Sequence, residues 1–167
     1  DSWNRLVKNL DTAARIARAE GLTPTFHHHA CTYVETVDEI AELLERTDIG
    51  LTLDTGHLIL GGGDPVGGLR RWAQRVNHLH LKDASRAVLR RVLDQGGGIQ
   101  ELWEAGAFVR LGAGDVDVAG VLETILASGY AGWLVVEQDI IPQTDQDRVR
   151  MWRDQEANRQ ALRKWFR

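Results

Sequence analysis

The sequence has a single cysteine, Cys31, so no disulfide can form within the chain. It also lacks any apolar run that approaches the roughly 20 residues of a membrane-spanning helix. The first residues are charged and helix-like rather than patterned as a signal peptide. Together these absences argue against a secreted or membrane-embedded protein, and we expect a cytoplasmic location.

Positive charge is not in excess either. Lysine and arginine number 20 against 24 aspartates and glutamates, which gives a formal net charge of −4. Nucleic-acid-binding domains usually present a basic face, and binding to an anionic membrane surface also needs basic residues. We therefore expect neither partner. With 43% hydrophobic and 26% charged residues, the 167-residue chain has the composition of a globular protein, and we expect residues 1–167 to form a single domain.

The pattern of apolar residues alternates between helix and strand character along the chain. The segments with strand character are 22–29, 49–57, 76–83 and 132–139. The segments with helical spacing are 3–21, 34–47, 64–75, 85–95 and 117–129, followed by a charged tail from 145 to 167. Strands that alternate with helices indicate βαβ units around a parallel sheet.

Each of the four predicted strands has a residue of metal-binding type at its carboxyl end. His27 or His29 ends the first strand, Asp54 the second, His80 the third and Glu137 the fourth. Because the carboxyl ends of parallel strands meet at one rim, we expect these side chains to lie together. Carboxylates supply negative charge and imidazoles favour transition metals, so the set suits a divalent ion such as Mn²⁺, Co²⁺, Zn²⁺ or Fe²⁺. An open coordination position could polarise a substrate carbonyl or hydroxyl.

Each of these residues also has an ordinary structural explanation. The run 27–29 could be a surface turn, Asp54 could cap a turn, and Glu137 could form an ion pair across the sheet. We favour the metal site because all four positions fall on the same edge. Lys82 and Asp83 directly follow the third strand, at the mouth of the rim, where an acid, a base or a substrate clamp would be useful.

Four stretches of the chain, between Leu22 and Asp139, resemble a known superfamily. They read "FHHHACTYVET", "LTLDTGHLILGGGDP", "VNHLHLKD" and "GAFVRLGAGDVDVAGVLETILASGYAGWLVVEQD". They are similar to the xylose-isomerase-like TIM-barrel superfamily of sugar isomerases, epimerases and a DNA-repair endonuclease. "LDTGH" and "HLHLKD" are shared across the superfamily. The histidine-rich first strand, "GGGDP" and "GYAGWLVVEQD" resemble its inosose dehydratase-like branch more narrowly.

The resemblance implies a metal site at Asp54, His80 and Glu137, with Mn²⁺ or Co²⁺ as the expected ion and Zn²⁺, Fe²⁺ or Mg²⁺ as alternatives. His27 stands where the superfamily often has a glutamate, and we take it as the fourth ligand. His57, the histidine of "DTGH", is a metal ligand in the endonuclease branch. We expect it to contact substrate here.

The same resemblance places His29 and Lys82 in the substrate pocket. Glu137 or His29 are the candidates for proton transfer, and Lys82 is the candidate for binding a substrate oxygen. Asp83 and Arg110 are expected to bind substrate as well. Arg110 is a departure, because relatives tend to have a Pro-Gly-x-Gly loop where this chain reads "RLGAG".

The activity implied is metal-dependent dehydration of a small cyclic polyol ketone, 2-keto-myo-inositol, to a dione through an enediolate. A sugar isomerase or epimerase with the same metal site is the nearest alternative. A non-catalytic half-barrel that serves in binding or assembly is an alternative of a different class. The endonuclease activity is not expected, because the chain lacks the further metal ligands of that branch.

Length adds one more expectation. A TIM barrel usually has eight strands and about 250 residues, whereas four strands are predicted here, and they correspond to the second half of the superfamily's barrel. The missing half would then come from a longer polypeptide, from a second copy in a homo-oligomer, or from another protein.

Overall fold

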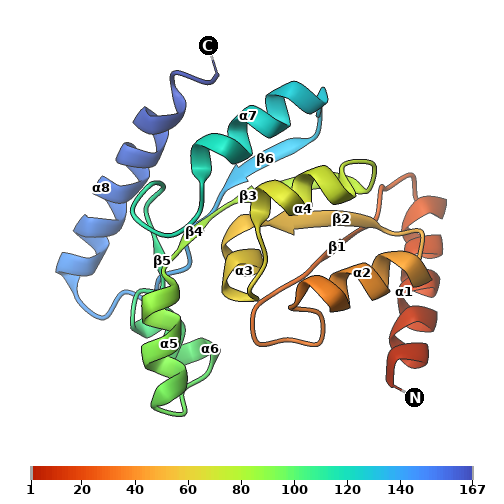
Figure 1. Ribbon diagram of the computed structural model, residues 1–167, viewed down its shortest axis with the longest axis horizontal. Helices are drawn as coiled ribbons and strands as arrows, with labels where there is room; N and C mark the ends of the chain where they lie inside the picture. The colour runs from red at the N-terminus through yellow and green to blue at the C-terminus, as the bar shows by residue number, and fades with distance from the viewer. Residues whose placement is uncertain (1, 167) are drawn as a thin grey trace.

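The structure, a computed structural model, describes residues 2–166. A four-stranded sheet with the order β1-β2-β3-β6 forms its centre, and every neighbouring pair is parallel (Figure 1). The strands are β1 Thr25–His27, β2 Gly50–Asp54, β3 Val76–Leu81 and β6 Trp133–Val136. The predicted parallel sheet is therefore confirmed, although each strand is shorter than the segment predicted for it.

Helices connect these strands. They are α1 Ser2–Ala19, α2 Val37–Arg46, α3 Thr55–Leu60, α4 Pro65–Trp72, α5 Arg86–Asp94, α6 Ile99–Glu104, α7 Val118–Ser128 and α8 Asp145–Leu162. In Figure 1, α2, α4 and α7 run alongside the strands, while α1 and α8 lie at opposite ends of the view. Within residues 2–166, no helix is both long and apolar enough to cross a membrane.

Three features differ from the prediction. The second strand ends at Asp54 rather than at residue 57, because the Asp54 side chain caps the short helix α3 that follows. Helix α6 was not predicted. A two-stranded antiparallel pair, β4 Asp83–Ala84 with β5 Phe108–Val109, was not predicted either. Both strands of this pair are too short to leave a periodic signal in the sequence.

The two faces of the sheet have different chemistry. One face is apolar and packs under the helices, and its central side chains are fully buried: Leu51, Leu53, Leu79 and Leu81. Each contributes about 1.5–3 kcal/mol of hydrophobic stabilisation. The register places the opposite set on the other face: Thr52 beside His78 and Trp133, and Asp54 beside His80 and Val135.

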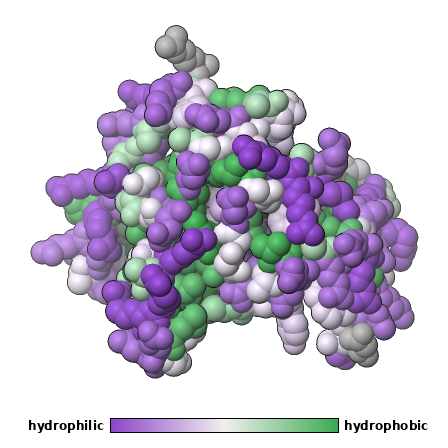
Figure 2. Space-filling view, viewed as in Figure 1, coloured by the Kyte–Doolittle hydropathy of each residue, from purple (hydrophilic) through white to green (hydrophobic). Residues whose placement is uncertain are grey.

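This second face is polar toward the strand ends and is not covered by helices over β6. Trp133 is 76% exposed there and Val135 is 37% exposed. Strands β1 and β6 are edge strands with one partner each in the described sheet. Figure 2, viewed from the same side as Figure 1, shows hydrophilic side chains over much of the surface with hydrophobic ones between them. The chain therefore has the form of half a parallel barrel.

Candidate metal centre at the carboxyl ends of the strands

The structure brings the four predicted ligands together. His27 ends β1, Asp54 ends β2, His80 lies near the end of β3, and Glu137 follows β6. Asp54 Oδ2 lies 3.5 Å from His27 Nε2 and 3.4 Å from His80 Nδ1. His80 Nδ1 in turn lies 3.0 Å from Glu137 Oε2. Asp54 Oδ2 thus lies between His27 and His80 at the rim, and the ligand atoms of Asp54, His80 and Glu137 all lie within 4.8 Å of one another.

These four atoms share a second property. His27 Nε2, Asp54 Oδ2, His80 Nδ1 and Glu137 Oε2 are buried, yet none has a partner with the geometry of a normal hydrogen bond. A buried polar atom left without such a bond typically costs about 1–3 kcal/mol. Ligand atoms with this defect fit a divalent cation, and the mixed nitrogen and oxygen set is typical of transition-metal sites.

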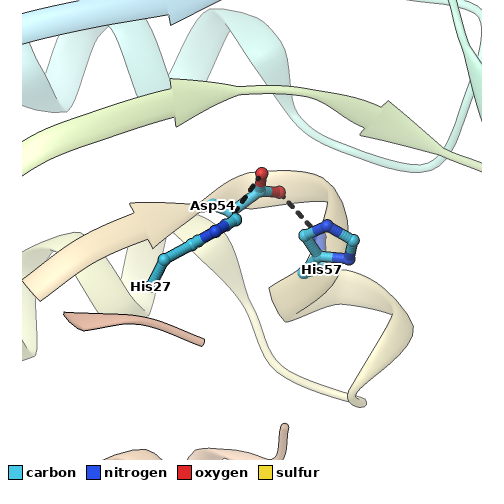
Figure 3. Close-up of side chains that lie close together, drawn as sticks. All are labelled: His27, Asp54 and His57. Carbon is cyan, nitrogen blue, oxygen red and sulfur yellow. Dashed lines mark hydrogen bonds and ion pairs between the residues drawn. The ribbon is translucent and has the colours of Figure 1, made fainter. Parts of the chain in front are cut away.

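The two carboxylate oxygens of Asp54 have different roles. Its Oδ1 accepts a 2.8 Å hydrogen bond from the backbone N–H of His57 and so caps α3. Its Oδ2 turns toward His27 (Figure 3). The capped turn and the metal ligand, which were alternatives for this residue, are therefore compatible, because each uses a different oxygen.

The protonation of the cluster follows from these contacts. Contacts with Asp54 and Glu137 raise the pKa of His80 to about 9. The same contact with His80, together with the Lys82 ammonium, lowers the pKa of Glu137 to about 2. Burial alone would raise the pKa of Asp54, but His27, His80 and nearby charges outweigh it and hold that pKa well below its usual value. Without a metal, the cluster thus consists of two carboxylates and a protonated His80.

His29 and His57 form the wall of the site next to this cluster. Their rings stack with centroids 3.6 Å apart. Burial lowers the pKa of His57 to about 2, so its ring stays neutral. Its Nε2 faces the Lys82 ammonium at 3.0 Å, and its Nδ1 faces the Ala30 N–H at a longer 3.4 Å. His29 Nδ1 lies 2.8 Å from the Ala30 carbonyl, which can only accept, so His29 donates from Nδ1 and its Nε2 keeps a free lone pair.

Lys82 is almost fully buried, at 1% exposure, beside the proposed ligands. Its Nζ lies 2.8 Å from Glu137, 3.0 Å from Asp139 and 3.2 Å from Asp54. Burial would lower the pKa of Lys82, but these carboxylates outweigh burial and raise it. Lys82 is therefore a fixed ammonium and a hydrogen-bond donor, not a base or a nucleophile.

Two supporting residues were not predicted from the sequence. Asp139 pairs with Lys82, and the only signal for it is its position two residues beyond Glu137 in "VEQD". His28 is completely buried, and its Nε2 accepts the backbone N–H of Asp54 at 3.1 Å. Burial lowers the pKa of His28 to about 4, so it remains a neutral acceptor that holds the end of β2 in place. The run 27–29 is therefore not a surface turn.

The structure does not place Asp83 and Arg110 where they were expected. The Asp83 carboxylate is fully buried and accepts hydrogen bonds from the backbone N–H groups of Ala84, Gly112, Gly114 and Val116. It points into the 111–116 loop and not into the mouth of the site, because those amides need an acceptor. Arg110 is exposed on the turn after β5, and within residues 2–166 no hydrogen bond or ion pair joins its side chain to the cluster.

Comparison with known proteins shows the family of the chain. A family model described as "Xylose isomerase-like TIM barrel" matches residues 1–167. The chain belongs to this family. Inosose dehydratase from Clostridium tetani is 35% identical over 145 residues, which are 85% of this chain and 49% of the relative. Inosose dehydratase from Geobacillus kaustophilus is 37% identical over 143 residues, which are 84% of this chain and 46% of the relative.

Among solved structures of the xylose isomerase-like family, a xylose isomerase domain protein from Planctomyces limnophilus matches with a TM-score of 0.75 and 26% identity. The match covers 98% of this chain and 53% of that one. The chain spans about half the length of the curated relatives it matches. The family resemblance and the half-barrel character expected from the sequence are thus confirmed.

Proposed function

We propose that this chain carries the metal-binding half of a divalent-metal-dependent dehydratase that acts on a cyclic polyol ketone, 2-keto-myo-inositol. The observation that carries the proposal is the presence of four buried ligand atoms without hydrogen-bond partners at the strand ends, three of which lie within 4.8 Å of one another. The inosose dehydratase relatives support the choice of reaction and substrate. In this proposal His27, Asp54, His80 and Glu137 hold the ion.

The bound ion would supply Lewis acidity, which polarises the substrate ketone and stabilises an enediolate. Lys82 would add a second positive charge, because its buried ammonium can donate to a substrate oxygen as negative charge develops there. His29 is the better candidate for the base, since its Nε2 lone pair is free while Glu137 is engaged in the cluster. Glu137 is also the weaker base, with its pKa lowered to about 2.

The same residues can carry out both proton transfers of the elimination. His29 Nε2 accepts the α-proton, and the electron pair left behind forms the enediolate. The proton on His29 can pass to the departing β-hydroxyl, so that one water leaves and the enol product becomes the dione. His57 would orient His29 by ring stacking and contact the substrate from the buried side.

The two edge strands suggest how the active protein is completed. We propose that β1 and β6 pair with four further strands from the other half of a longer polypeptide, of the size of the relatives. Those strands would cover the exposed side chains Trp133 and Val135. Two copies of this chain could satisfy the same edges, and light scattering at micromolar concentration distinguishes these arrangements. A monomeric mass excludes the pair of copies.

The direct test is loss of water from 2-keto-myo-inositol, followed by mass spectrometry with Mn²⁺ or Co²⁺ present. The chain is assayed alone and mixed with the first half of a relative. The Asp54→Asn variant is the matched control, because its amide oxygen can still cap α3 while the ligand charge is lost. We expect metal-dependent dehydration that the variant lacks. Metal-loaded protein without dehydration in either preparation would contradict the proposal.

A second candidate function is an isomerase or epimerase of a ketose. It is favoured by the same observation, because an enediolate formed beside the ion and His29 could also be reprotonated without loss of hydroxyl. Profiling with ketohexoses separates the two reactions. Exchange of the α-proton with solvent and no water loss would favour this second candidate.

A further inference from the structure

Lys82 lies between two groups of side chains, each with the spacing of metal ligands. The ligand atoms within each group lie within 4.8 Å of one another. The first group is Asp54, His80 and Glu137. The second group is His29, His57 and Asp139, and a third group, His27, Asp54 and His57, shares one residue with each of these two. The first is the core of the proposed metal centre, while nothing so far explains the ligand-like arrangement of the second.

The contacts of the ammonium connect both groups. Lys82 Nζ lies 3.2 Å from Asp54 Oδ2 and 2.8 Å from Glu137 Oε2, two atoms that would hold the ion of the first group. It also lies 3.0 Å from His57 Nε2 and 3.0 Å from Asp139 Oδ2, two atoms of the second group. A cation in the place of the ammonium would therefore contact two ligands of the first ion, as expected where two ions lie only about 3.5–4 Å apart.

The charges favour one metal ion beside Lys82 rather than two. Three carboxylates, Asp54, Glu137 and Asp139, contact the ammonium and carry three negative charges. One divalent ion and one ammonium neutralise them. A second divalent ion would lie in direct contact with the ammonium in a buried site, where like charges repel strongly.

The second group could bind an ion if the ammonium were removed. His29 donates from Nδ1 to the Ala30 carbonyl, which leaves Nε2 available. The His57 ring is fully buried, and its Nε2 already faces a cation at 3.0 Å. Asp139 provides the negative charge. Two imidazoles and a carboxylate are a common donor set for Co²⁺ and Zn²⁺.

The surrounding chain fixes the lysine in this position. The Phe108 ring lies under the ammonium, with 5.0 Å from Nζ to the ring centroid. A Cβ on Gly56 would come within 2.6 Å of Lys82 Cγ, so the glycine of "DTGH" leaves room for the lysine stem. The ammonium is therefore held in place and not simply the end of a mobile surface side chain.

We propose that the Lys82 ammonium takes the place of a second divalent cation, so that the centre holds a single metal ion. Removal of that ammonium then opens a second divalent-cation site at His29, His57 and Asp139. This inference rests on the proposed metal centre and explains what limits it to one ion. It also gives Lys82 a role in metal stoichiometry that is separate from any contact with substrate.

The test is the number of Co²⁺ ions bound per chain after equilibrium dialysis, measured by elemental analysis. Wild type and Lys82→Arg, which keeps the charge, should each bind one ion. Lys82→Met, which keeps an unbranched apolar stem and removes the ammonium, should bind two. Lys82→Met combined with Asp139→Asn should bind one again. With Mn²⁺, electron paramagnetic resonance of Lys82→Met should show the broadening of two neighbouring ions.

Each outcome decides the proposal. One ion in wild type and one in folded Lys82→Met would overturn the inference and leave the proposed metal centre intact. Two ions in wild type would overturn it without any variant. If neither protein binds an ion, the metal centre and the inference fail together. An ion bound only by Lys82→Met would contradict the proposed metal centre and, with it, the inference that the wild-type centre holds one ion. If Lys82→Met does not fold, as judged by circular dichroism, Lys82→Gln takes its place.

Discussion

Two buried aspartates at the strand ends, Asp54 and Asp83, have the same exposure and different partners. Both are fully buried. The two oxygens of Asp83 accept four backbone N–H groups, three of them from the 111–116 loop. Asp54 satisfies only Oδ1, through the His57 N–H, and its Oδ2 faces side chains without a regular hydrogen bond. Burial alone therefore does not distinguish a structural carboxylate from a functional one, but an account of its hydrogen bonds does.

The largest effect on stability should come from Asp83→Ala. The substitution leaves four backbone N–H groups without their acceptor: the hydrogen bonds from Ala84 and Val116 are buried, and those from Gly112 and Gly114 are partly buried. We expect the free energy of unfolding to fall by about 3–5 kcal/mol, because each unpaired buried group costs about 1–3 kcal/mol and some will find water. Urea denaturation measures it. A loss below about 1 kcal/mol would mean that Asp83 does not anchor the loop.

Asp54→Asn should affect metal affinity more than stability. The amide oxygen can still accept the His57 N–H, so we expect a smaller loss of stability than for Asp83→Ala. The affinity for Co²⁺ should fall at least about 100-fold, since a charged ligand is lost. Calorimetric titration gives the affinity, and urea denaturation gives the stability. Equal losses of stability in the two variants would remove the distinction between the two aspartates.

Two glycines, one packed against Asp83 and one against Lys82, allow the structural region and the metal centre to be compared again. A Cβ on Gly114 would lie 2.3 Å from Asp83 Oδ1, and a Cβ on Gly56 would lie 2.6 Å from Lys82 Cγ. We expect each alanine variant to cost about 1–3 kcal/mol of stability through overpacking. Gly56→Ala should in addition weaken Co²⁺ binding, because it displaces Lys82 beside the ligands, whereas Gly114→Ala should leave the affinity unchanged. Similar metal affinities in the two variants would contradict this assignment.

The metal affinity should also depend on pH, through the protonation of His80. Its pKa is raised to about 9 by contacts with Asp54 and Glu137, so at pH 7 an incoming ion must displace a proton. Metal affinity should therefore rise about tenfold per pH unit from pH 7 to about 9 and then level off. Calorimetry in buffers of different ionisation enthalpy should report about one released proton. Affinity that does not change over this range would contradict a protonated His80.

The raised pKa of His80 also makes the stability of the metal-free protein depend on pH. The folded pKa of His80 lies above its ordinary value of 6.5, so its contribution to stability is complete below pH 6.5 and is lost as the pH rises through about 9. Glu137 has the opposite sign. Its pKa falls from 4.5 to about 2, so its contribution is present above pH 4.5 and is lost as the pH falls toward 2. Metal-free stability should therefore be greatest between about pH 4.5 and 6.5.

The sequence predicts the sheet and the rim because both depend on local patterns. Alternating apolar residues identify the strands, and a ligand-type residue at each strand end follows from the parallel order. The direction of Asp83 cannot be predicted in this way, because its partners lie about 30 residues later in a loop without periodicity. His28 and Asp139 were missed for a similar reason. Their roles depend on contacts with Asp54 and Lys82 across the fold.

The central claim is that the strand ends form a divalent metal centre, and titration of the purified chain with Mn²⁺ and Co²⁺ by calorimetry, with Asp54→Asn in parallel, tests it most directly. We expect one ion bound per wild-type chain and a loss of at least about 100-fold in affinity for the variant. A folded wild-type chain with the same heat as Asp54→Asn would contradict it.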